Sequence, residues 1–231
     1  MIVCLSSPSY LPPPTGGGGP GISFTSDFTS TSVASGNIIT NVPANTVDGD
    51  FLLFIGCVRG TVSFDYPFTN PGGWTTIHAS VDGSLRVSNI HVAYKRASSE
   101  PGSYTWTVDS AADVGGGVMW RLTGVVGSGD PTSGTPVATH DNTAGSVNWT
   151  ATGMTTADAN AGVVGCHYMR NTGFTVTAQT LDGSAFPELI EIPKIAICAQ
   201  IQAAAGATGT FEGTDGEDND RSSLVFALKP A

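Results

Sequence analysis

Apolar and polar residues alternate along much of the chain, with the period of two that is typical of β-strands. Residues 85–96 alternate between an apolar face and a polar face, formed respectively by Ile90, Val92 and Tyr94 and by Asn89, His91 and Lys95. The same period recurs over residues 118–123, 195–201 and 224–228. We expect each of these segments to be an antiparallel strand with one face in the core and the other in solvent.

Residues 51–58 are apolar at almost every position, which predicts a central strand that is covered on both faces. Shorter strands are predicted over residues 22–28, 74–81, 104–108, 147–150, 161–169 and 174–178. The best helical candidate, residues 196–205, alternates like a strand and is followed by Gly206. The pattern therefore predicts an all-β, two-sheet antiparallel sandwich with jelly-roll-like connections.

The composition favours the same fold class. Charged residues make up only 12% of the 231 residues, and glycine accounts for 30 of them. The chain is therefore poor in the residues that build amphipathic surface helices and rich in turn formers. Its length fits a single β-sandwich domain, which we expect over residues 21–231.

Residues 1–20 differ from the rest because a polyproline stretch and a glycine tract follow each other there. Such a segment cannot form a packed core of its own. We interpret it as an extended N-terminal arm, which is either a disordered leader or a segment that orders on a neighbouring subunit. The candidate subunit-contact residues of the arm are Leu5, Tyr10, Leu11, Pro12, Pro13 and Pro14.

The net charge of −10 excludes two classes of partner. An acidic surface repels phosphate groups, so we expect neither nucleic acid nor an anionic membrane as a partner. The first residues lack a signal-peptide pattern, and no apolar run approaches the ~20 residues of a membrane span. We therefore expect synthesis in a bacterial cytoplasm.

The sequence contains no recognisable motif for catalysis or for cofactor binding. The glycine tracts at 16–19 and 115–117 precede no helix, which favours loops over phosphate-binding turns. The histidines show no metal-ligand spacing, and they are His78, His91, His140 and His167. Four glutamates could supply a carboxylate pair for sugar cleavage, although their spacing selects none: Glu100, Glu188, Glu191 and Glu212. We expect no enzyme, no cofactor and no metal.

Three other groups of residues have a structural and a functional interpretation. Cys57, Cys166 and Cys198 lie in apolar runs, which favours buried free thiols. The acidic residues 215–220 favour a solvated hairpin loop, with a calcium site as the alternative. The tryptophans are core residues or a sugar-binding platform, with the core favoured for each: Trp74, Trp106, Trp120 and Trp149.

One series of short motifs is more specific than a generic β pattern. In chain order it comprises Gly49-Asp50, Arg59-Gly60, Pro71-Gly72-Gly73-Trp74-Thr75, Lys95-Arg96-Ala97, Glu100-Pro101 with Tyr104, Arg121 with Gly124-Val125, and the closing element Ala227-Leu228-Lys229-Pro230. The series resembles a β-sandwich family of tailed bacteriophages and prophages, found among virion structural proteins. The resemblance covers residues 45–130 well and the rest loosely, and it implies no catalytic residue.

The resemblance implies a role in a virus particle. The leading hypothesis is a capsid decoration or cement protein on the virion surface, which binds the major capsid protein lattice and stabilises the shell. Such a protein is expected to be a homo-oligomer, for which a trimer is one option. The alternative is a tail-associated or fibre-associated module that contacts host-surface glycan, and a carbohydrate-active or toxin-like sandwich is a third interpretation.

Overall fold

The computed structural model describes residues 21–33, 36–60, 67–79, 88–108, 112–141, 148–168, 176–192, 195–214 and 221–231. The candidate arm residues Leu5, Tyr10, Leu11, Pro12, Pro13 and Pro14 lie outside these ranges, as do Cys4 and the acidic residues 215–220. The described residues form strands and loops only, so the predicted all-β class is confirmed. No helix that could cross a membrane is found among them.

The described ranges contain nineteen strands. The first eight, β1 to β8, are Ser23–Val33, Ile38–Asn41, Phe51–Gly60, Phe68–Thr69, Thr75–Ala79, Ser88–Arg96, Ser103–Val108 and Ala112–Thr123. The next six, β9 to β14, are Val137–Asp141, Asn148–Ala151, Thr155–Thr156, Ala161–Tyr168, Thr177–Leu181 and Ser184–Ala185. The last five, β15 to β19, are Glu188–Ile192, Ile195–Gln202, Gly206–Ala207, Phe211–Thr214 and Arg221–Leu228.

The first half of the chain forms two packed sheets. The inner sheet has the strand order β1-β8-β3-β6-β5, and the outer sheet has the order β2-β7-β4. Leu52 and Phe54 of β3 point to the outer sheet, where Trp106 of β7 stacks on Phe54 with ring centroids 3.5 Å apart. The predicted central strand is β3, and residues 51–59 are buried on both of its faces.

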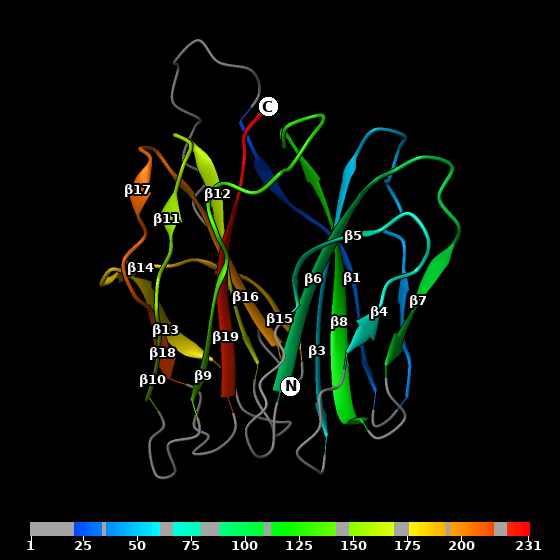
Figure 1. Ribbon diagram of the computed structural model, residues 1–231, viewed down its shortest axis with the longest axis horizontal. Coiled ribbons are helices and arrows are strands. Elements are labelled where there is room, and N and C mark those ends of the chain that lie inside the picture. The colour runs from blue at the N-terminus through cyan, green and yellow to red at the C-terminus, as the bar shows by residue number, and fades with distance from the viewer. Residues whose placement is uncertain are drawn as a thin grey trace, which may run out of the picture.

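The second half repeats this arrangement. Its inner sheet has the order β9-β19-β12-β16-β15, and an outer sheet has the order β10-β18-β13-β14. In both halves, the first strand pairs with the last strand, which in turn pairs with a central strand, β3 or β12. Each central strand carries a Gly-Cys pair, Gly56-Cys57 in β3 and Gly165-Cys166 in β12. The chain is thus built from two units with matching strand order, which lie side by side in Figure 1.

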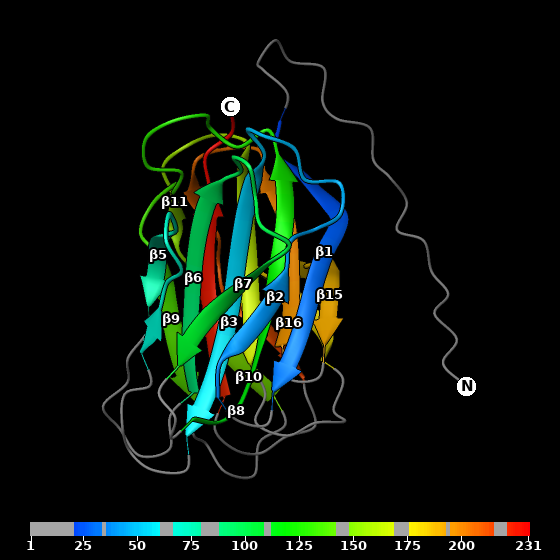
Figure 2. The same cartoon turned by 90° about the vertical axis from the view of Figure 1, so that its right-hand side faces the viewer.

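The two inner sheets face each other across a common core. This core joins Ile55 and Trp120 of the first unit to Cys166, Ile197 and Phe226 of the second. The result is four β layers, which are seen edge-on in Figure 1 and face-on in Figure 2. The antiparallel β-sandwich is confirmed, and the structure adds two outer layers to the predicted two sheets. The jelly-roll connections stay a prediction.

The additional layers correct the prediction for strand β6. Asn89 and His91 were expected on a polar face in solvent, but their side chains are only 2% and 3% exposed. The outer sheet covers this face, and the ring of Phe68 from β4 stacks on His91 at 5.0 Å. The alternating pattern therefore predicted the strand correctly. The prediction that the polar face of this strand is exposed to solvent was wrong.

Residues 115–117 were predicted to be a loop and instead lie within β8. Here glycine permits close packing between strands. A Cβ atom on Gly117 would lie 2.8 Å from a ring carbon of Phe54, and one on Gly115 would lie 2.8 Å from Val58 Cγ1. The side chains of β3 thus fill the space that a larger residue in β8 would need.

Candidate functional site

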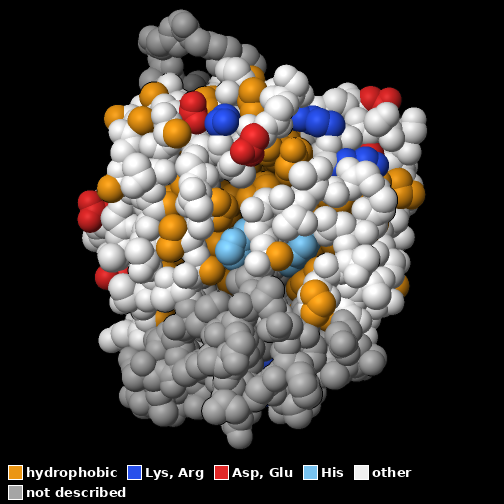
Figure 3. All heavy atoms as spheres, viewed as in Figure 1, with side chains coloured by type: hydrophobic (Ala, Val, Ile, Leu, Met, Phe, Trp, Pro, Cys, Tyr) orange, Lys and Arg blue, Asp and Glu red, His pale blue; other side chains and the backbone are white. Residues whose placement is uncertain are grey.

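Charged side chains gather at one end of the first unit, along the upper rim of the face in Figure 3. We call this group the end cluster, and its members are Asp27, Asp50, Lys95, Arg96, Glu100, Tyr104 and Arg121. Strand register explains why they meet: Phe51 is paired with Arg96 of β6, and the next residue of β3, Leu52, with Arg121 of β8. The turn over residues 47–50 places Asp50 directly beside them.

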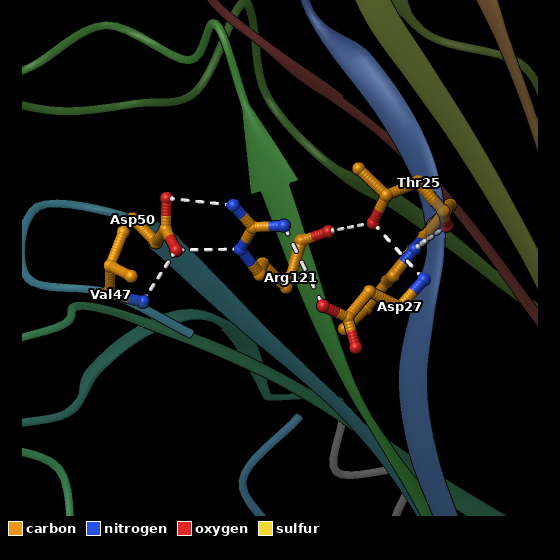
Figure 4. Close-up of polar contacts among 6 residues, drawn as sticks. Thr25, Asp27, Val47, Asp50 and Arg121 are labelled. Atoms are coloured by element: carbon orange, nitrogen blue, oxygen red, sulfur yellow. Dashed lines mark hydrogen bonds and ion pairs between the residues drawn. The ribbon is translucent and has the colours of Figure 1, made fainter. Parts of the chain in front are cut away.

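Arg121 is the centre of the contacts drawn in Figure 4. Its Nε donates to Asp50 Oδ2 at 2.6 Å, and its Nη1 lies 3.6 Å from Asp27 Oδ2. The carbonyl oxygen of Arg121 accepts a hydrogen bond from Thr25 Oγ1 at 2.5 Å. Asp50 also accepts a hydrogen bond from the Val47 amide at 2.8 Å. These contacts hold β1, β8 and the turn before β3 together.

The contact between Asp50 and Arg121 fixes the charge of both groups. Burial alone would raise the pKa of Asp50, but the hydrogen bonds from Arg121 and from the Val47 amide outweigh it and lower that pKa. The hydrogen bond to Asp50 raises the pKa of Arg121. Both side chains are therefore ionised at neutral pH, as a structural ion pair requires.

Arg96 closes the same end of the first unit from the other side. Its guanidinium lies over the Phe51 ring, 4.9 Å from the centroid, and donates hydrogen bonds to the carbonyl oxygens of Val125 and Val126. The Val126 amide in turn donates to the Lys229 carbonyl oxygen at 3.0 Å. Arg96 thus helps to fasten the segment that leads from the first unit to the second.

Lys95, Glu100 and Tyr104 form the third part of the end cluster. Lys95 Nζ lies 2.9 Å from Glu100 Oε1 and donates to the Tyr104 hydroxyl at 2.6 Å, and that hydroxyl donates to Glu100. Burial would lower the pKa of Lys95, but its bonds to Tyr104 and Glu100 raise it. Burial would raise the pKa of Glu100, but its bonds to Tyr104 and Lys95 lower it. A general acid or base needs a pKa near the working pH, and these groups are shifted away from it.

The geometry of the end cluster predicts a measurable contribution to stability. Asp50→Asn should lower the free energy of unfolding by about 1–2 kcal/mol at pH 7, because Arg121 loses the closer of its two carboxylate partners in a partly buried site. Urea denaturation of wild type and variant measures this loss. Asp182→Asn is the matched control, since Asp182 lies in an exposed hairpin turn at φ 53°, a conformation that asparagine also adopts. An equal loss in both variants would contradict a specific role for Asp50.

The glutamates considered for sugar cleavage are distributed over two units. Glu100 belongs to the end cluster, and Glu212 of β18 accepts a hydrogen bond from Thr210 Oγ1 at 3.1 Å. Glu188 and Glu191 both lie on β15, where burial first and the charge of Glu191 second raise the pKa of Glu188 to about 7. Glu188 is held by a hydrogen bond from Gln179 Nε2, and Glu191 by the Val176 amide.

An open cleft with a volume of about 650 Å³ lies in the second unit. Its lining consists mostly of glycine, threonine and small apolar residues: Gly134, Thr135, Val137, Gly153, Met154, Thr155, Asp182, Ala207, Gly209 and Thr210. Asp182 is the one carboxylate in this lining, and neither Glu188 nor Glu191 takes part in it. The cleft and the glutamate pair therefore do not combine into one site.

The candidate cysteines of the described ranges and the four tryptophans are buried. Cys57, Cys166 and Cys198 are free thiols in the core, as predicted. The four tryptophans are at most 7% exposed, so the core interpretation is confirmed for each of them and a tryptophan platform for sugars is ruled out. His167 stacks on Trp149 with ring centroids 3.9 Å apart. Within the described ranges, no three His, Cys, Asp or Glu side chains are placed to hold a metal ion.

The end cluster contains five charged residues of the motif series recognised in the sequence, which are Asp50, Lys95, Arg96, Glu100 and Arg121. Arg59, near the other end of β3, and Lys229, just after β19, are not members of it. The motif therefore encodes contacts that fasten one end of the fold. Asp27 was missed, since it lies in an irregular part of β1 between Phe24 and Phe28. Comparisons of the chain with protein-family models, with curated proteins and with solved structures give no match.

Proposed function

We propose that this chain is a structural protein of a tailed-bacteriophage virion and works as a capsid decoration or cement protein. It binds the lattice of the major capsid protein from outside, as a homo-oligomer, and stabilises the shell. The proposal is supported by the motif series in the sequence, whose charged residues make fixed structural contacts. It is also supported by the pKa directions in the end cluster, which suit a role in holding the fold and not in catalysis.

The observation that carries the proposal is a flat, uncharged surface on the outer sheet of the first unit. We call this surface the outer face. Its exposed side chains are those of Ile39, Asn41, Thr69, Ser103, Thr105 and Thr107. They form cross-strand pairs, among them Ile39 with Thr105 and Thr69 with Thr107. Hydroxyl groups cost less to desolvate than charged groups do, and covering the central isoleucine is favourable.

The outer face stands out because the chain as a whole is acidic. The sequence contains 19 acidic and 9 basic residues, which disfavours close approach to other acidic surfaces. A face without charge is the part that can be covered at low electrostatic cost. Repetition of such a modest contact over a symmetric shell gives high avidity. Neither nucleic acid nor a membrane is a partner in this proposal.

The copy number of the chain in purified virus particles tests the proposal. A decoration protein is present in on the order of hundreds of copies per particle, because it follows the symmetry of the shell. A tail or fibre module that contacts glycan is present in far fewer copies, on the order of a few to a few dozen. Quantitative mass spectrometry against the major capsid protein distinguishes the two, and the lower number would favour the tail alternative.

A variant of the outer face tests the docking surface itself. Ile39→Asp places a charge at the centre of the outer face, where the native side chain is 54% exposed and contributes little to folding. We expect binding to capsids that lack the chain to become at least tenfold weaker. Ile201→Asp is the matched control, because Ile201 is 41% exposed and lies on β16 of the second unit. Undiminished binding by Ile39→Asp would place the docking surface elsewhere.

A further inference from the structure

The common core reaches the surface at one edge of the molecule, between β5 and β9. Four apolar side chains there are only partly buried while they pack against the core: Ile77, Tyr94, Val126 and Ala138. We call them the edge groove. Figure 3 shows hydrophobic side chains in a hollow in the middle of this face, next to histidine. The edge groove is thus an apolar surface that is distinct from the outer face.

Two sheet edges border the edge groove. Strands β5 and β9 are the outermost strands of the two inner sheets, and each pairs with one described neighbour, β6 or β19. An edge strand presents a row of N–H and C=O groups that an added extended segment can bond. Apolar side chains between two such edges favour an extended, apolar peptide as the occupant.

The arm of residues 1–20 has the chemistry of such a peptide. It contains no charged residue, so the whole net charge of −10 resides in residues 21–231. Leu5, Tyr10 and Leu11 are its apolar anchors, and Pro12 to Pro14 form a stretch of the kind that docks on aromatic side chains. The groove offers the ring of Tyr94, which is held by stacking on Phe51 with ring centroids 5.4 Å apart.

The topology favours binding of the arm to a second copy of the chain. The arm continues into β1, and β1 and β5 are the opposite edges of the first inner sheet. The point at which the arm joins β1 is therefore at the edge of the sheet opposite its own groove. Twenty extended residues span up to ~66 Å, which is longer than the ~40 Å of the twelve-residue strand β8. That length suffices to reach a neighbour.

We propose that residues 1–20 of one copy dock in the edge groove of a second copy and link the subunits. The arrangement deepens the proposed function, on which it rests for its biological setting. Electrostatics favours this contact over direct packing of two sandwiches, because two bodies of charge −10 repel each other whereas an uncharged arm approaches freely. The arm is the link between copies, and the outer face is the contact with the capsid.

Three variants of the full chain test this link by sedimentation equilibrium. Deletion of residues 1–20 removes the arm, and Ile77→Asp charges the groove. Each alone should weaken self-association at least tenfold. Ile39→Asp is the matched control, because it charges an exposed isoleucine away from the groove and should associate like the wild type. Circular dichroism verifies folding, and Ala138→Arg replaces Ile77→Asp should the latter not fold.

Mixing the two defective chains gives the decisive result. The truncated chain keeps its groove, and the Ile77→Asp chain keeps its arm, so a mixture should form one-to-one heterodimers although neither forms homodimers. A wild-type chain that is monomeric, a truncated chain that still self-associates, or a mixture without heterodimers would each overturn the arm–groove contact. These outcomes leave the capsid copy number unaffected, so the failure of this inference is distinguishable from the failure of the proposed function.

Discussion

Replacing His91 by phenylalanine is expected to abolish a loss of stability of about 3 kcal/mol that this histidine causes as the pH falls from 7.5 to 4.5. Burial first, and the charge of His78 second, lower the pKa of His91 from 6.5 to about 4. The His91 side chain is 3% exposed and lies among the rings of Phe54, Phe68 and Trp106. A proton on this ring would be a buried charge without a counter-charge.

The hydrogen bonds of His91 explain why the neutral form is favoured. Asn70 Nδ2 donates to Thr76 Oγ1 at 2.9 Å, which leaves Asn70 Oδ1 to accept from His91 Nε2 at 2.7 Å. The other ring nitrogen, Nδ1, is buried and has no hydrogen-bond partner among the described residues. Protonation would add a second N–H there with nothing to accept it. The neutral ring donates one hydrogen bond, which Asn70 accepts. The imidazolium form would leave its second N–H without an acceptor, and it is therefore disfavoured.

The direction of the pH effect follows from this lowered pKa. Below pH 6.5 the unfolded chain binds a proton at His91 while the folded chain does not until about pH 4, so stability falls as the pH falls through this window. The lowered pKa of His91 corresponds to a loss of about 3 kcal/mol in the free energy of unfolding once the pH has fallen from 6.5 to about 4. In His91→Phe this loss is absent, so the free energy of unfolding at pH 4.5, relative to that at pH 7.5, should be higher than in the wild type. Glu188, whose pKa is raised to about 7, contributes with the opposite sign and to the same extent in both proteins.

Urea denaturation at pH 7.5 and at pH 4.5 measures the effect. Phe68→Leu is the matched control, since it removes packing from the same group of rings without removing a titratable group. It should lower stability by a similar amount at both pH values. If His91→Phe retained the wild-type difference between pH 7.5 and pH 4.5, another group would be responsible for the acid sensitivity.

His91 also illustrates how far the sequence predicts the fold. The alternation of residues 88–96 identified β6, and the apolar run of residues 51–58 identified β3 as a central strand. The polar side of β6 was expected in solvent because the pattern of one strand reveals its two faces but not how many layers cover them. The outer sheet that buries Asn89 and His91 is made of short strands, and β4 comprises only Phe68 and Thr69. A two-residue strand produces no alternation that a sequence pattern could reveal.

The repeated architecture was hidden for a similar reason. The Gly-Cys pairs at residues 56–57 and 165–166 occupy matching central strands, yet two residues are too short a repeat to be recognised without the strand order. The charged motif residues of the end cluster were found, but their contacts could not be. Asp50 and Arg121 are 71 positions apart, and only the pairing of β3 with β8 brings them together. Strand register is a long-range property, which local patterns do not specify.

The second large effect is expected for Gly153→Ala, beside the cleft of the second unit. A Cβ atom on Gly153 would lie 1.6 Å from the carbonyl oxygen of Gly209, far inside contact distance. The obstacle is backbone, which cannot rotate away as a side chain would. Two hydrogen bonds hold these loops together, from the Met154 amide to Thr208 Oγ1 at 2.9 Å and from the Thr208 amide to the Met154 carbonyl at 2.8 Å.

The methyl group can be accommodated only if the two loops separate and these hydrogen bonds lengthen. We expect Gly153→Ala to lower the free energy of unfolding by about 3 kcal/mol, or the melting temperature by roughly 6–12 °C. Gly127→Ala is the matched control, since a Cβ atom there would meet nothing within 4 Å and should leave the melting temperature almost unchanged. Equal melting temperatures for both variants would mean that the loops lining the cleft can separate at little cost in free energy. The cleft would then be a deformable surface and not a rigid one.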